Sequence, residues 1–281
     1  MKLGINLLLW TAAAGEADLP RIENIRSWGF DGVEFPMFSP ACSPWPRLAT
    51  ALDAMGLGRT AVTILPEDGS LISGESAERR KGLDHLKACV EACAVLGAPI
   101  LSGPLYSPCG RLVRRGPNQE EWKRAVEGLR AAGEHAAQAS MALAIEPLNR
   151  FETYFLNCQA DAVRLAEEIQ LPNVGVMFDT FHANIEEKSP AGAIQTAAPR
   201  LRHVHISAND RATPGEDHIP WPEVFSALKR AGYDGWLTIE AFGRALPEVA
   251  AATCIWRSMA PNEDHIARAG AQFIRRAWSA A

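Results

Sequence analysis

The feature that most constrains the fold is a regular alternation of strand-like and helix-like segments along the whole chain. Short apolar or β-branched runs are each followed by a longer segment whose apolar residues recur at helical spacing. The pattern predicts eight strands, at residues 3–10, 33–35, 60–65, 99–103, 141–146, 173–179, 201–206 and 235–240. Strands that alternate with helices form parallel sheets, and a count of eight favours a closed (β/α)8 TIM barrel.

A predicted helix follows each of these strands, at residues 19–28, 48–55, 76–96, 119–139, 160–169, 191–198, 221–231 and 266–278. Gly56, Gly97 and Gly232 stand where three of them should end. Neither a repeat nor a low-complexity linker divides the chain, so we expect one barrel domain over residues 1–281. An open doubly wound sheet is the alternative, but the sequence lacks the glycine-rich dinucleotide fingerprint that would support it.

The composition is typical of a soluble globular protein. The 281 residues are 47% hydrophobic and 22% charged, with a formal net charge of −5. Arg111, Arg114 and Arg115 come closest to a basic cluster, and a solvated loop explains them better than nucleic-acid binding does. Since no run approaches the roughly 18 apolar residues of a membrane span, we expect neither a nucleic-acid nor a membrane partner.

The cysteines and the N-terminus both favour a cytoplasmic protein. Six cysteines, at positions 42, 89, 93, 109, 158 and 254, form no CxxC pair. Cys89 and Cys93 share one face of a predicted helix and are interpreted as small buried hydrophobes. The N-terminal segment superficially resembles a signal peptide, but Gly4 and Asn6 interrupt its apolar run. We therefore expect a first barrel strand there, without export.

Acidic and imidazole side chains stand at the carboxyl ends of the last four predicted strands. These four residues, called the metal quartet below, are Glu146, Asp179, His205 and Glu240. In a (β/α)8 barrel such strand ends meet at one mouth. A single carboxylate there is usually a cap or an ion-pair partner, but three together repel one another unless a cation is present. We therefore predict a divalent metal site. Its oxygen-rich ligand set with one imidazole favours Mn²⁺, with Co²⁺ or Mg²⁺ as alternatives. Zinc is disfavoured because it usually takes more nitrogen or sulfur ligands.

Further polar residues follow three of these strand ends and should lie above the metal quartet. They are Glu152, His182 and Arg211, each three to six residues beyond a quartet member. Each alone could be a surface charge. Together they supply an anion, an imidazole and a fork of donors, which suits a polyhydroxylated substrate.

Two other histidines are interpreted as structural. His203 precedes His205 by two residues, so it points to the same face of its strand, one layer deeper in the barrel. It is more simply an interior histidine that supports the site than a ligand. His218 is interpreted as a loop residue.

Four segments resemble the ketose 3-epimerases that act on D-tagatose, D-allulose (psicose) and L-ribulose, members of the xylose-isomerase-like barrel superfamily. They read IEPLNRFETYFLN, FDTFHANIEE, HVHISANDRATPGEDHIPW and GYDGWLTIEAF. The resemblance is strong over residues 144–242 and weak elsewhere, apart from CIWRSMAP at residues 254–261. FDTFHANIEE with the NRFE and GYDG elements is specific to the family, whereas the metal quartet recurs across the superfamily.

The resemblance implies a role for each site residue. The metal quartet matches the family's metal ligands, and Glu146 and Glu240 also match its two acid/base carboxylates, one on each face of the substrate. Glu152, His182 and Arg211 match the residues that hold the O1 to O3 region of the ketose. These roles imply epimerisation of a free ketose at C3 through a cis-enediolate that the metal stabilises. The resemblance also implies a homodimer or homotetramer.

The sequence departs from the tagatose 3-epimerase pattern in two loops. GINLLLW in the first strand lacks a polar and aromatic run, and SGPLYSPCGR after the fourth strand lacks a tryptophan. Trp10, Glu34 and Tyr106 are therefore candidate pocket residues, with plain packing as the alternative for each. The preferred ketose, with five or six carbons, is left open by these differences.

Other activities share this barrel and metal site. An aldose–ketose or hydroxypyruvate-type isomerase would move the proton between C1 and C2, and an inosose dehydratase would eliminate water. A phosphodiesterase like endonuclease IV needs three metals and more histidine ligands than the seven histidines here provide. A sugar-binding barrel without activity would keep the ligands but show no proton exchange. We expect the C3 epimerase.

Overall fold

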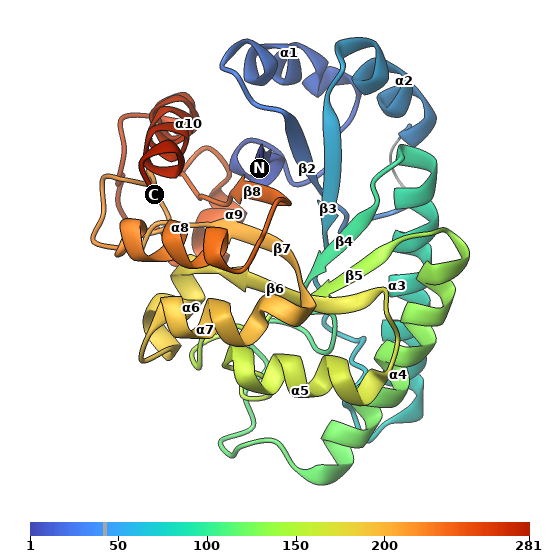
Figure 1. Ribbon diagram of the computed structural model, residues 1–281. Coiled ribbons are helices and arrows are strands. Elements are labelled where there is room, and N and C mark those ends of the chain that lie inside the picture. The colour runs from blue at the N-terminus through green and yellow to red at the C-terminus, as the bar shows by residue number, and fades with distance from the viewer. Residues whose placement is uncertain (42–43) are drawn as a thin grey trace.

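The computed structural model describes residues 1–41 and 44–281, in which eight parallel strands close into a barrel (Figure 1). Each strand pairs with the next along the chain, and β8 pairs with β1. The strands are β1 Lys2–Asn6, β2 Gly32–Pro36, β3 Gly58–Val62, β4 Ile100–Gly103, β5 Ala142–Ile145, β6 Val174–Asp179, β7 Leu201–Ile206 and β8 Trp236–Ile239. The predicted (β/α)8 barrel is confirmed, and the open doubly wound sheet is excluded. Cys42 lies outside the described residues.

Helices surround the strands on the outside of the barrel (Figure 1). The principal ones are α1 Leu19–Ser27, α2 Trp45–Met55, α3 Ser76–Leu96, α4 Gln119–Gln138, α5 Gln159–Ile169, α7 Pro190–Ala197, α8 Trp221–Arg230 and α10 Glu263–Ala280. Two shorter helices, α6 Thr180–Glu186 and α9 Pro247–Ala252, follow β6 and β8 and escape prediction because two turns hold too few periodic positions. No helix in the described chain has both the length and the apolar character needed to cross a membrane.

Local sequence signals explain where these elements begin and what they bury. Every residue of β6 is buried, as expected for a parallel strand covered on both faces. Asn118 and Glu121 form a capping box at the start of α4, each side chain accepting a 2.9 Å hydrogen bond from the other's backbone N–H. Cys89 and Cys93 are buried on α3 as predicted, and burial raises the pKa of Cys89 to about 12.

The first strand is shorter than predicted. The β1 pairing ends at Asn6, and Leu7–Leu9 form a 3-10 turn. The cause is local, because the Asn6 side chain accepts a hydrogen bond from the Leu8 backbone N–H at 2.9 Å. The turn places Leu8 at the barrel mouth and carries the following chain, including Trp10, away from it.

Candidate active site and metal centre

The last four strands bring the metal quartet together at the barrel mouth. Asp179 ends β6 and His205 lies in β7 directly beside it in the register, while Glu146 and Glu240 immediately follow β5 and β8. One ligand atom from each of the four lies within 4.8 Å of the others. All four side chains are buried. The structure therefore juxtaposes the four residues as the sequence predicts.

Two buried atoms in this cluster have no hydrogen-bond partner. Asp179 Oδ2 and His205 Nδ1 neither accept a hydrogen bond from a described residue nor donate one to it. His205 Nδ1 lies 3.7 Å from Asp179 Oδ2 and 3.3 Å from Glu240 Oε1. Buried polar atoms are normally satisfied, so this pair and the oxygen-rich donor set around it fit a divalent cation.

Asp179 serves the fold and the site at the same time. Its other oxygen, Oδ1, accepts hydrogen bonds from the backbone N–H groups of Phe181 and His182, at 2.7 and 3.0 Å. These bonds cap α6 and hold the carboxylate in one orientation. The remaining oxygen, Oδ2, is consequently aimed at the cluster.

The electrostatics of the cluster also favour a cation. Burial, with the charges of Glu240 and Asp179, raises the pKa of Glu146 well above its ordinary value. Burial raises the pKa of Asp179 to about 6. For Glu240 burial acts in the same direction, but His205 and Arg211 outweigh it and lower the pKa. Burial would lower the pKa of His205, yet the neighbouring carboxylates raise it well above the ordinary value. The cluster thus needs protons or a cation to offset its negative charge.

Glu152, His182 and Arg211 line a cavity of about 190 Å³ above the cluster, together with Glu146 and Glu240. Arg211 is buried, with its guanidinium 3.9 Å from the centre of the Phe181 ring. Its Nη1 donates to Glu240 Oε2 at 2.7 Å, and its Nη2 lies 3.6 Å from Glu152 Oε1. The structure thereby brings the three predicted substrate contacts into one cavity with the quartet.

His182 is held as a neutral donor. Its Nδ1 accepts the backbone N–H of Asn149 at 3.0 Å, which leaves the ring proton on Nε2. Burial, with the charge of Arg211, lowers the pKa of His182 well below its ordinary value. His182 Nε2 lies 3.3 Å from Arg211 Nη2. Two donors cannot satisfy each other, so both are available to one acceptor oxygen in the cavity.

The opposite side of the cavity is apolar, which the sequence did not predict. Its lining includes Leu8, Phe38, Val62, Ile64 and Val249, and it continues to Phe242, whose ring centre lies 5.0 Å from the Arg211 guanidinium. These residues come from the first three strand ends, the loop after β8 and α9, which share no sequence motif. Only the folded barrel brings them together. The cavity consequently has one charged end and one apolar end.

The three candidate pocket residues lie elsewhere in the described chain. Trp10 donates through Nε1 to Asp264 at 3.2 Å, outside the cavity, because the 3-10 turn after β1 redirects the chain. Tyr106 is fully buried and its hydroxyl donates to the carbonyl of Glu146 at 3.1 Å, so it supports the rim from behind. Glu34 is fully buried in the barrel interior. None of the three lines the cavity, so the alternative of a packing role holds for each of them.

Glu34 and His203 lie beneath the metal quartet. His203 is fully buried with Nε2 2.8 Å from Glu34 Oε2, which confirms it as an interior histidine. Burial alone would raise the pKa of Glu34, but the charges of His205 and His203 lower it far below its ordinary value. His218 is an exposed loop residue, as predicted.

Comparison with known proteins extends the similarity over the whole barrel. The chain matches the model of the xylose isomerase-like TIM barrel family over residues 22–277. A probable ketose 3-epimerase from Synechocystis sp. is 31% identical over 99% of this chain and 97% of that protein. The structure of an L-ribulose 3-epimerase superposes with a TM-score of 0.94 at 30% identity, covering 99% of this chain and 95% of that one. A D-psicose 3-epimerase from Clostridium cellulolyticum, solved with D-tagatose, gives a TM-score of 0.90 at 29% identity and covers 99% of both chains.

Proposed function

Because the chain belongs to the xylose isomerase-like TIM barrel family and, within it, to the ketose 3-epimerases, we propose that it epimerises a free ketose at C3 with a divalent metal. The observation that carries this proposal is the placement of two carboxylates. Glu146 and Glu240 flank Asp179 and His205 along the rim, so they approach one cavity from two sides. Inversion at C3 requires a proton acceptor on one side of the substrate and a donor on the other.

The proposed reaction begins with removal of the C3 proton, which is acidic because C2 is a ketone. Either Glu240 or Glu146 takes this proton, and the other returns one to the opposite face, with the roles exchanged in the reverse direction. A divalent ion held by the metal quartet would polarise the ketone and stabilise the enediolate by several kcal/mol. His182 Nε2–H and Arg211 Nη2 would donate to the oxygen that develops negative charge.

The cavity favours a sugar without a phosphate group. Among its described lining residues Arg211 is the cation, and its Nη1 is already bound to Glu240 at 2.7 Å. A phosphate dianion would have to compete with that carboxylate and with Glu152 beside it. We therefore propose an unphosphorylated ketopentose or ketohexose, with O1 to O3 at the charged end and the distal carbons against the apolar end.

Solvent isotope exchange tests the reaction. With Mn²⁺ in D₂O, a panel of free ketopentoses and ketohexoses should give C3 epimers that carry deuterium at C3, measured by NMR. Label at C1 or C2 with an aldose product would instead indicate an isomerase. Loss of ketose with a rising enone-type absorbance would indicate a dehydratase. Absence of exchange across the whole panel would contradict an enzymatic role for the quartet.

Arg211→Lys tests the proposed contact with the developing oxyanion. Lysine keeps the positive charge but cannot bind Glu240 and also hold a second donor beside His182. We expect kcat/KM for C3 exchange to fall about 10²-fold, as when one oxyanion donor is lost. Arg150→Lys is the matched control, because Arg150 pairs with Glu186 at 2.9 Å on an exposed loop. Equal effects in the two variants would argue against a substrate contact.

Three further expectations from the sequence analysis stay proposals. We propose that Mn²⁺ is the preferred ion, that the chain forms a homodimer or homotetramer, and that it acts in the cytoplasm. Light scattering of the purified protein measures the second of these directly.

A further inference from the structure

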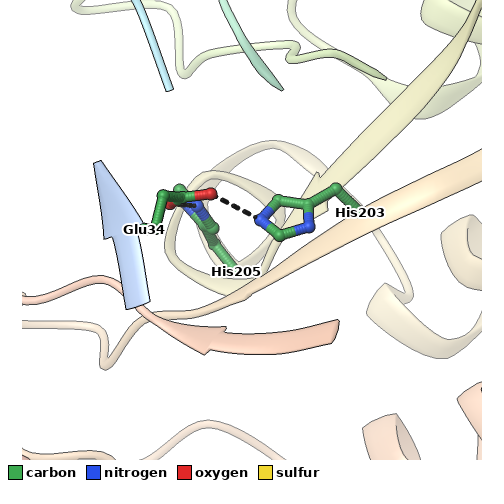
Figure 2. A group of neighbouring side chains, drawn as sticks. All are labelled: Glu34, His203 and His205. Carbon is green, nitrogen blue, oxygen red and sulfur yellow. Dashed lines mark hydrogen bonds and ion pairs between the residues drawn. The ribbon is translucent and has the colours of Figure 1, made fainter. Parts of the chain in front are cut away.

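A fully buried carboxylate joins two histidines of β7 beneath the metal quartet (Figure 2). Glu34 reaches inward from β2, with Oε1 2.6 Å from His205 Nε2 and Oε2 2.8 Å from His203 Nε2. Figure 2 shows both rings directed toward this one carboxylate from neighbouring positions on the same strand. All three side chains are 0% exposed, so water cannot replace either contact.

Two further donors fix the orientation of Glu34. Thr60 Oγ1 donates to Oε2 at 2.9 Å, and Asn6 Nδ2 donates to Oε1 at 3.3 Å. Asn6, Glu34 and Thr60 are level with one another in the register of β1, β2 and β3. Each carboxylate oxygen therefore has two partners, contributed by β7 and by a strand adjacent to β2. A carboxylate held from three strands cannot rotate without losing several of these contacts.

The contact with Glu34 determines which His205 nitrogen faces the quartet. An ionised carboxylate only accepts hydrogen bonds, so His205 Nε2 must carry the proton, and the lone pair of the neutral ring is then on Nδ1. Nδ1 is the atom that lies 3.7 Å from Asp179 Oδ2 and 3.3 Å from Glu240 Oε1. It is also the ring nitrogen without a hydrogen-bond partner among the described residues.

We infer that Glu34 is the positioning residue of the metal centre: it fixes the tautomer and ring orientation of His205 so that Nδ1 faces the ion. Carboxylates that accept the distal N–H of a metal-bound histidine orient the ring and increase the basicity of the ligand nitrogen. His203 supports the same carboxylate from the next layer down, and in this arrangement it does not touch the ion. The inference rests on the metal site of the proposed function but not on the identity of the sugar.

A second cation bound by Glu34, His203 and His205 is the competing interpretation, because one atom from each lies within 4.8 Å of the others. Two observations disfavour it. His205 Nε2 is already at hydrogen-bond distance from Glu34, and both Glu34 oxygens accept other donors. An ion there would have to displace the Thr60 and Asn6 contacts.

The test measures metal affinity without any sugar. Glu34→Gln preserves the size of the side chain but removes its charge. In metal-stripped protein we expect its Kd for Mn²⁺, from calorimetry, to rise about 10- to 100-fold. The absorption spectrum of the Co²⁺ complex should also change, because the imidazole ligand loses its fixed orientation. Thr60→Val is the matched control, since it removes a donor to the same carboxylate and leaves the contact with His205 intact. Its affinity should stay near that of the unsubstituted protein.

Two results would overturn the inference. Unchanged Mn²⁺ affinity and an unchanged Co²⁺ spectrum in Glu34→Gln, with a lower melting temperature of the metal-free protein, would make Glu34 a core ion pair and nothing more. Binding of two Mn²⁺ per chain, with one lost in the variant, would make Glu34 a ligand itself.

A measurement on the unsubstituted protein remains decisive if Glu34→Gln does not fold. Proton NMR of the Co²⁺ complex in H₂O should show a strongly shifted, slowly exchanging imidazole N–H, which disappears when the complex is prepared in D₂O. Absence of such a signal would show that His205 does not bind the ion through Nδ1 with Nε2–H held by Glu34. Since neither measurement involves substrate, failure of the epimerase proposal and failure of this inference are distinguishable.

Discussion

Glu240→Gln and Glu146→Gln should each lower kcat/KM for C3 epimerisation by about 10³-fold. Glutamine cannot take up or release the C3 proton, and a positioned acid or base contributes about 10²- to 10⁴-fold. The measurement is the rate of epimer formation at saturating Mn²⁺, with the metal content of each variant determined in parallel. Glu186→Gln is the matched control, because Glu186 also pairs with an arginine at the barrel mouth but lies outside the cavity.

The two variants should also differ from each other, which a loss of metal alone would not produce. In a two-base reaction, removal of one carboxylate leaves the other able to exchange the C3 proton of one epimer with solvent. Each variant should therefore exchange deuterium into one epimer without inverting it, and the two variants should prefer opposite epimers. Equal loss of exchange with both epimers, restored by excess Mn²⁺, would instead restrict both carboxylates to metal binding.

The barrel and the quartet were predictable because both depend on position along the strands. Parallel strands with helical connections place the carboxyl end of every strand at the same mouth. The positions of Asp179 and His205 near the carboxyl ends of their strands are therefore enough to place both side chains at that mouth. Their neighbours Glu146 and Glu240 follow by the same reasoning. The capping role of Asp179 also lies within one short segment, FDTFH. Local patterns of this kind survive folding unchanged.

The role of Glu34 could not be read from the sequence, because it depends on stagger across the barrel. Its position at a strand end suggested a pocket residue. Whether a side chain on β2 contacts substrate or His205 is decided by the tilt of the strands, and Glu34 and His205 are 171 residues apart in the sequence. Trp10 was misassigned for a local reason, the 3-10 turn that Asn6 caps. The apolar end of the cavity combines residues from several strand ends with Val249 of α9, a short helix that carries almost no periodic signal.

Removal of the divalent ion should abolish epimerisation and leave a protein that becomes less stable as pH rises. Without the ion, burial raises the pKa of Asp179 from its ordinary 3.8 to about 6, and the pKa of Glu146 lies well above 4.5. These carboxyls hold protons in the folded protein that the unfolded chain releases. Their stabilising contribution is therefore complete below about pH 4 and is lost as pH rises through the folded-state values. For Asp179 alone the difference corresponds to about 3 kcal/mol.

The two histidines of the site modify this dependence in opposite directions. The pKa of His205 is raised, so its contribution is also lost above the ordinary value of 6.5, whereas the pKa of His182 is lowered and its neutral ring favours folding at higher pH. The lowered pKa values of Glu34 and Glu240 act at more acidic pH. As pH rises from 5 to 8, Asp179, Glu146 and His205 thus lower the stability of the metal-free protein and His182 raises it. We expect a net loss of stability.

Thermal unfolding at pH 5 and pH 8, with chelator or with excess Mn²⁺, measures this effect. The metal-free protein should melt at a lower temperature at pH 8, and Mn²⁺ should raise the melting temperature more at pH 8 than at pH 5. At an ion concentration 1,000 times Kd, the gain in the free energy of unfolding is about 4 kcal/mol.

Asp179→Asn supplies the control, because asparagine Oδ1 can still cap α6 while the charge at Oδ2 is gone. The metal-free variant should exceed the metal-free parent in stability at pH 8, yet gain little from Mn²⁺. A metal-free parent equally stable at both pH values would show that the quartet holds no protons, and a melting temperature that Mn²⁺ does not raise at either pH would show that the quartet does not bind the ion.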